Sequence, residues 1–257
     1  MTSKQIMFCG DPHGRFDHIV KFAEQTGAAT LVLLGDMEPA RPLHDELAPI
    51  IQRGTPVYWI AGNHDADSDQ VWIHVWDSQL AAQNIHARVV ELADGTRLAG
   101  LGGVFRKMVW YPGLSAACGS EPAFWTREQH AKATPRQDRW RGRGTHRKHW
   151  STIYPSELEG LANQQADILV SHEALGYHPR GFQVLDDLAR QMGVEVAVHG
   201  HQHDSRDSSA RWAEQRFRSF GVGLRGLSLL DTSSMAWTVV QPGELDAARP
   251  HRIEGHQ

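Results

Sequence analysis

The 257-residue sequence contains little cysteine and no long hydrophobic run. Its two cysteines are Cys9, in an apolar stretch, and Cys118, in a polar one. Two such residues do not make a disulfide framework, which favours a reducing compartment. No stretch approaches the roughly 18 apolar residues of a membrane helix, and the first residues lack the basic and apolar regions of a signal peptide. We therefore expect a cytoplasmic protein with no membrane partner.

A strong excess of either charge is also absent. The net charge of −4 predicts no general affinity for nucleic acids or membranes. Residues 104–151 differ, because they carry ten basic and three acidic side chains, a local charge of +7, and four of the nine tryptophans. We predict one domain over residues 1–243, with a basic insertion or cap at about 104–151, followed by a polar tail at 244–257.

Short apolar runs of strand length recur along the chain, at residues 5–10, 30–35, 56–62, 167–172 and 194–200. Continuous apolar runs are typical of strands that are covered on both faces. Segments with helical periodicity that end in glycine lie at residues 16–27, 42–54 and 181–193, the second interrupted by Pro49. Residues 84–92 and 96–103 indicate a hairpin, and three more strand-like runs follow residue 216. This alternation predicts a layered α/β fold.

Polar side chains that can bind metals follow five of these runs directly, namely Asp11 and His13, Asp36, Asn63 and His64, His172, and His201 and His203. In open α/β sheets, ligands bind outside the carboxyl ends of the strands. A mixed set of oxygen and nitrogen ligands is typical of Mn, Fe, Zn or Ni rather than Ca or soft copper. Two such ions about 3.5–4 Å apart, bridged by a carboxylate, can clamp a phosphoester.

Each of these motifs alone has a structural explanation as a turn, a helix cap or a hydrogen-bonded strand end. Only their conjunction points to a metal site. We expect His199, one position before the last motif, to be structural. The sequence leaves open whether Glu38 lines the site or faces solvent. His178 is a further histidine on the loop after His172.

The blocks D-P-H, G-D, G-N-H-D, H and G-H-Q-H occur in this order across residues 11–203. This pattern resembles the calcineurin-like metallophosphoesterase superfamily. The resemblance implies an αββα sandwich of two mixed β-sheets flanked by helices, with a dinuclear metal site at the carboxyl ends of strands.

Carried over position by position, the resemblance implies that one ion is held by Asp11, His13, Asp36 and His203. The other ion would be held by Asp36, Asn63, His172 and His201. His64 would face the phosphate, with Asp65 orienting its ring, while a metal-bridging hydroxide attacks phosphorus. The cofactors would be two divalent transition-metal ions, Mn²⁺ first, with Fe, Zn or Ni as alternatives.

The sequence indicates the substrate less closely than it indicates the metal ligands. The stretch "GDMEPAR" places its arginine at Arg41, later than in the protein phosphatases, and Ala66 stands where they carry arginine. Residues 104–151 are either a solvated surface packed down by tryptophans or a cap that binds an anionic substrate through Arg139, Arg141 and Arg143. We expect a phosphodiesterase or phosphatase acting on a nucleotide or nucleic acid. The alternatives are a phosphomonoesterase on a small metabolite and a non-catalytic scaffold, which the complete ligand set disfavours.

Overall fold

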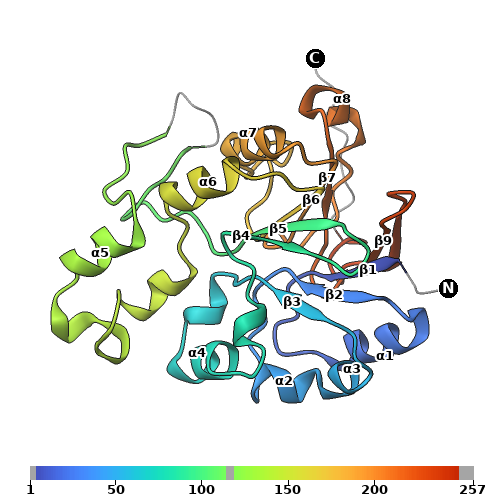
Figure 1. Cartoon of the computed structure of the whole chain (residues 1–257), viewed down its shortest axis with the longest axis horizontal. Helices are drawn as coiled ribbons and strands as arrows, with labels where there is room; N and C mark the ends of the chain where they lie inside the picture. The colour runs from blue at the N-terminus through green and yellow to red at the C-terminus, as the bar shows by residue number, and fades with distance from the viewer. Residues whose placement is uncertain (1–3, 114–118, 249–257) are drawn as a thin grey trace.

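A computed structural model describes residues 4–113 and 119–248 of the chain, with two five-stranded mixed sheets at its centre (Figure 1). Across the first sheet lie, in order, β10 (Trp237–Gln241), β9 (Leu227–Asp231), β1 (Gln5–Cys9), β2 (Thr30–Leu33) and β3 (Val57–Trp59). Across the second lie β4 (Arg88–Glu91), β5 (Arg97–Leu101), β6 (Ile168–Ser171), β7 (Val196–His199) and β8 (Arg218–Gly221).

Each sheet is mainly parallel and is antiparallel at one margin only. β1, β2 and β3 are parallel, whereas β9 runs antiparallel to β1 and β10 antiparallel to β9. In the second sheet β5 to β8 are parallel, and β4 pairs antiparallel with β5 as the expected hairpin. The predicted strands are therefore confirmed, and the carboxyl ends of the parallel strands mark one edge of each sheet.

The central strands are buried on both faces, as their continuous apolar runs predicted. Successive side chains of a strand point to opposite faces. Ile6 and Phe8 of β1 accordingly pack between the two sheets, in a cluster that includes Val170 of the second sheet. Met7 and Cys9 enter a separate cluster on the outer face. The fold therefore has three apolar layers, one between the sheets and one outside each.

Helices cover both outer faces, which completes the predicted αββα sandwich. Those that pack on the first sheet are α1 (Asp17–Thr26), α2 (Leu43–Glu46), α3 (Ala48–Gln52) and α4 (Asp69–Trp76). Those on the second are α6 (Pro155–Ala162) and α7 (Gln183–Met192). The predicted helix at 42–54 is broken at Leu47, just before Pro49. No helix within the described residues is long and apolar enough to span a membrane.

Short helical turns connect these elements: η1 (His64–Ala66), η2 (Ala81–Gln83), η7 (Ser209–Arg211) and α8 (Trp212–Gln215). The basic insertion predicted at residues 104–151, called the basic segment below, contains α5 (Arg127–Ala133), η4 (Arg136–Asp138), η5 (Trp140–Gly142) and η6 (Arg147–Ser151). Figure 1 shows α5 at the left of the view, outside the two sheets. Cys118 lies outside the described residues.

Tryptophans attach the basic segment to α4. The ring centroids of Trp140 and Trp150 lie 5.5 and 4.8 Å from that of Trp72, in edge-to-face contacts. Trp125 is 48% exposed. These rings mostly pack the segment down, which is the structural one of the two roles expected for it.

Candidate metal centre

The carboxyl ends of five parallel strands bring the predicted polar residues together. Asp11 and His13 follow β1, Asp36 follows β2, and Asn63 follows β3 in the first sheet. In the second sheet His172 comes directly after β6, and His201 and His203 follow β7. Residues separated by up to 192 positions thus meet where the two sheets adjoin.

The backbone at this edge is sharply turned. Six non-glycine residues here have a positive φ, namely Asp11, His13, Asp36, Glu38, His201 and His203, with values between 42° and 67°. Such conformations cost about 1–3 kcal/mol each and persist only where the surrounding structure enforces them. Close packing adds a further constraint, because a Cβ on Gly62 would overlap with the Asp36 carboxylate and the His172 ring. The fold therefore stores strain at the positions that aim these side chains.

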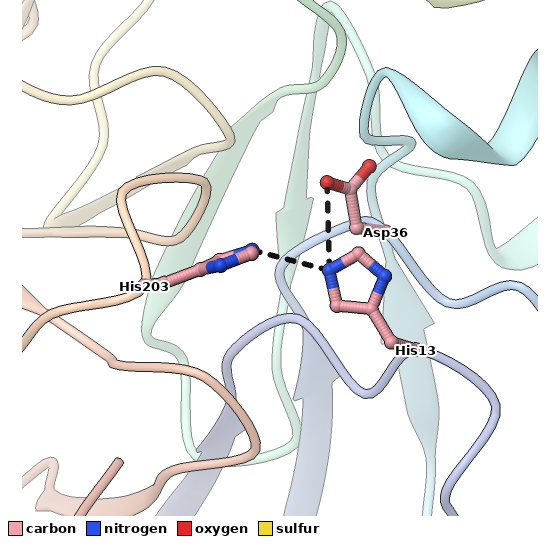
Figure 2. Close-up of side chains that lie close together, drawn as sticks. All are labelled: His13, Asp36 and His203. Carbon is pink, nitrogen blue, oxygen red and sulfur yellow. Dashed lines mark hydrogen bonds and ion pairs between the residues drawn. The ribbon is translucent and has the colours of Figure 1, made fainter. Parts of the chain in front are cut away.

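His13, Asp36 and His203 form the first potential metal-binding group, and Figure 2 shows the two rings and the carboxylate converging. The Nε2 atoms of His13 and His203 are 3.1 Å apart, and His13 Nε2 is 4.0 Å from Asp36 Oδ2. Glu38 contacts His13 Nδ1, on the far side of the ring. Glu38 therefore orients the His13 ring from the side opposite Nε2, while its own side chain is partly exposed.

Asp36 also belongs to the second group, with His172 and His201. His172 donates from Nδ1 to the Leu34 carbonyl at 2.7 Å, so its Nε2 faces the site. That Nε2 atom lies 3.5 Å from Asp36 Oδ2 and 3.3 Å from Asn63 Oδ1. The two groups thus share one carboxylate, the arrangement that the resemblance implies.

The donor set fits two divalent cations. Asp11 is fully buried, its Oδ1 accepts from the His201 backbone N–H, and its Oδ2 has no hydrogen-bond partner among the described residues. Burial raises the pKa of the Asp11 carboxyl to about 7. A bound cation would satisfy this buried oxygen and ionise the group. The Asp36 and Asp11 carboxylates outweigh the opposing effect of burial and raise the pKa of His172 to about 10, so the cluster attracts positive charge.

His64 begins η1 beside this cluster, and its backbone N–H donates to Asp36 Oδ1 at 2.8 Å. The structure corrects the role predicted for Asp65. Asp65 is buried and accepts backbone hydrogen bonds from Met37, Glu38 and Gly62, so it holds the loops together. The His64 ring is instead bonded through Nδ1 to Asp67 Oδ2 at 2.7 Å. One turn of η1 carries Asp67, rather than the adjacent Asp65, to the ring.

The charged neighbours also act on the protonation of His64. Partial burial lowers the pKa of its ring, but the Asp36 charge and the Asp67 hydrogen bond outweigh it, so the pKa is raised. The hydrogen bond to Asp67 thus orients the ring, and the raised pKa favours the protonated form, which can donate a proton toward an anion.

Arg147 of the basic segment supports this loop. Its Nε donates to the Ala66 carbonyl at 3.0 Å and one Nη to the Asp67 carbonyl at 2.8 Å, while it also pairs with Asp69. η6 accordingly packs against η1. The basic segment thus reaches the residue that holds the His64 ring, a role that its composition did not single out.

The arginines predicted to bind substrate are placed differently. Arg141 pairs with Asp77 at 2.6 Å and lies over the Trp72 ring, and Arg139 donates to the Thr134 carbonyl. Arg143 is exposed. None of the contacts found within the described residues joins these three side chains to the metal centre. Their part in substrate binding stays a prediction.

Two further residues complete the surroundings. Glu173 follows His172 and is buried, with one carboxylate oxygen 3.7 Å from His201 Nε2. Its position immediately after a ligand was the only sequence signal for it. His199 is buried, donates from Nδ1 to the Gly200 carbonyl and bonds the Tyr177 hydroxyl at 2.7 Å, in agreement with the structural role expected for it.

The fold and the site define an α/β sandwich protein with a candidate dinuclear metal centre. Residues 4–205 match the calcineurin-like phosphoesterase family. A relative from Haemophilus influenzae (strain ATCC 51907 / DSM 11121 / KW20 / Rd), an uncharacterised protein, is 37% identical over 234 residues, covering 91% of this chain and 97% of the relative. The chain therefore belongs to the calcineurin-like phosphoesterase family.

Solved structures support the fold. The crystal structure of the Thermus thermophilus protein TT1561 superposes with a TM-score of 0.62 at 17% identity, covering 93% of this chain and 99% of that one. At this identity the likeness bears on the arrangement of the sheets and helices alone.

Proposed function

We propose that this protein is a metal-dependent hydrolase that acts as a phosphodiesterase or phosphatase on a nucleotide or nucleic acid. The observation that carries the proposal is the convergence of both metal-binding groups on the shared carboxylate of Asp36, beside the unpartnered oxygen of Asp11. Two divalent ions, Mn²⁺ by preference for this mixed ligand set, would supply the Lewis acidity that activates water and neutralises charge on the phosphate.

His64 supplies the proton chemistry that the chain itself contributes. Because Asp67 bonds its Nδ1, its Nε2 remains available to a phosphate oxygen or to the leaving group. The side chain is 42% exposed and its ring centroid lies 5.5 Å from that of His13, so a substrate at the metal centre is within reach. Arg147 and Asp67 keep this geometry by fixing the loop and the ring.

The charge distribution supports an anionic substrate with more than one phosphate. The basic segment has a net charge of +7 and contacts the η1 turn beside the metal centre through η6, whereas the remaining residues have a net charge of −11. Because most of the segment's tryptophans are engaged in packing, the support for a nucleotide comes from charge rather than from base stacking.

A substrate panel tests the proposal. The protein loaded with Mn²⁺ is assayed on bis-p-nitrophenyl phosphate, p-nitrophenyl phosphate, cyclic nucleotides, and short RNA and DNA. We expect chelator-sensitive hydrolysis, with nucleotide or nucleic-acid substrates preferred. Preference for small phosphomonoesters would favour a metabolite phosphatase, and the absence of turnover on every substrate would favour a scaffold.

A further inference from the structure

The segment that leaves β5 runs along the metal edge, although it carries no predicted ligand. β5 is parallel to β6 and pairs Leu101 with Ser171, the residue before His172. The chain then turns through Gly103, where a Cβ would meet the Ser151 backbone at 2.8 Å. The Phe105 backbone N–H donates to Glu173 Oε1 at 3.0 Å. Arg106, the next residue, is therefore anchored beside the second metal-binding group.

The Arg106 side chain is held from η6. Its Nε donates to Thr152 Oγ1 at 3.1 Å and its Nη2 lies 3.5 Å from Ser151 Oγ. η6 in turn packs against the η1 turn that begins with His64. Arg106 is thus linked to Glu173 through the preceding Phe105 backbone and to the His64 turn through the end of η6. The two hydroxyls contact Nε and Nη2, on one edge of the guanidinium, and Nη1 remains available for a ligand.

Arg106 also has no counter-ion in the part of the chain that the structure describes. Within the described residues its half-buried guanidinium forms no ion pair, whereas Arg127 pairs with Glu157 and Arg147 with Asp69. Burial lowers the pKa of Arg106, and the charges that oppose this include those of Asp67, Glu173 and Asp36. Asp36 belongs to both metal-binding groups, Glu173 lies 3.7 Å from His201 Nε2, and Asp67 bonds the His64 ring. A partly buried cation without a partner is costly unless a ligand supplies the anion.

We propose that Arg106 binds a non-bridging oxygen of the phosphoryl group that is hydrolysed at the metal centre, an inference that rests on the proposed function. A guanidinium presents a planar fork of N–H donors that matches two oxygens of a phosphate, and it remains charged at every physiological pH. Ser151 and Thr152 fix the plane of that fork.

Binding of inorganic phosphate, measured by calorimetry on the Mn²⁺-loaded protein, tests the inference without turnover. We expect Arg106→Gln to raise the Kd for phosphate about 10- to 100-fold, which is typical of losing a charge-assisted pair. Arg106→Lys, which keeps the charge but not the fork, should fall between wild type and Arg106→Gln. The matched control is Arg136→Gln, which removes an exposed arginine of the same segment and should bind phosphate as wild type does.

Elemental analysis and circular dichroism accompany each variant, so that loss of metal or of folding is seen directly. If Arg106→Gln does not fold, the Kd of Arg106→Lys carries the test. Phosphate binding by Arg106→Gln or Arg106→Lys as tight as wild type overturns the inference, and so does a wild-type protein that binds no phosphate. A protein that binds phosphate through Arg106 but hydrolyses nothing on the panel would refute the proposed function alone.

Discussion

Glu157 of α6 connects the basic segment to the second sheet. Its carboxylate bonds Arg127 of α5 at 2.9 Å, lies 3.1 Å from His86 Nε2, and accepts from the Tyr154 backbone N–H at the start of its own helix. Burial raises its pKa, but His86 and Arg127 outweigh this effect and lower the pKa from 4.5 to about 2. This difference, at about 1.4 kcal/mol per pH unit, corresponds to about 3 kcal/mol of stability.

The sign follows from the direction of this pKa change. A carboxyl whose pKa is lower in the folded state stabilises the fold above its unfolded value and loses this contribution as the pH falls through the folded value. We therefore expect wild-type stability to decline between pH 4.5 and about 2 as Glu157 takes up a proton. Glu157→Gln should remove about 1–3 kcal/mol at pH 7, because the amide retains shape and part of the hydrogen bonding.

Urea denaturation at a series of pH values measures both quantities. The control is Glu159→Gln, on the exposed face of the same helix, which should stay within about 0.5 kcal/mol of wild type. If Glu157→Gln matched wild type at pH 7 and kept the same acid slope, the carboxylate would not join the segment to the sheet as described.

Three further predictions concern the site. Asp36→Asn should lower metal content at both sites by elemental analysis, and a variant that keeps two ions per chain would argue against the shared carboxylate. His64→Ala should cut turnover roughly 10²–10⁴-fold with metal content unchanged. Asp67→Asn should lower kcat by a smaller factor. Full activity of either variant on a substrate with a poor leaving group would contradict the assigned roles. Neutralising Arg139, Arg141 and Arg143 together should raise KM for polyanionic substrates and leave KM for p-nitrophenyl esters little changed. The effect should depend on salt, since exposed charges are screened over about 8 Å. Equal effects on both kinds of substrate would contradict a role of these arginines in binding polyanions.

Much of the fold could be predicted from the sequence because the relevant information is local. A continuous apolar run such as that around Val196 is typical of a strand buried on both faces, and a glycine such as Gly27 marks a helix end by its left-handed conformation. The metal-binding residues follow such runs directly, so their common edge followed from the parallel sheet. Their order along the chain then indicated the family.

The tertiary structure decided which side chains act together, because side-chain direction depends on turns and packing that no local pattern encodes. Asp65 adjoins His64 in sequence, yet the η1 turn sends its carboxylate to three backbone N–H groups and brings Asp67 to the ring. The basic segment likewise suggested Arg141, which proved to be paired with Asp77. The backbone before Arg106 lies beside Glu173 because β5 pairs in parallel with β6, a relation that exists only once the sheet has formed.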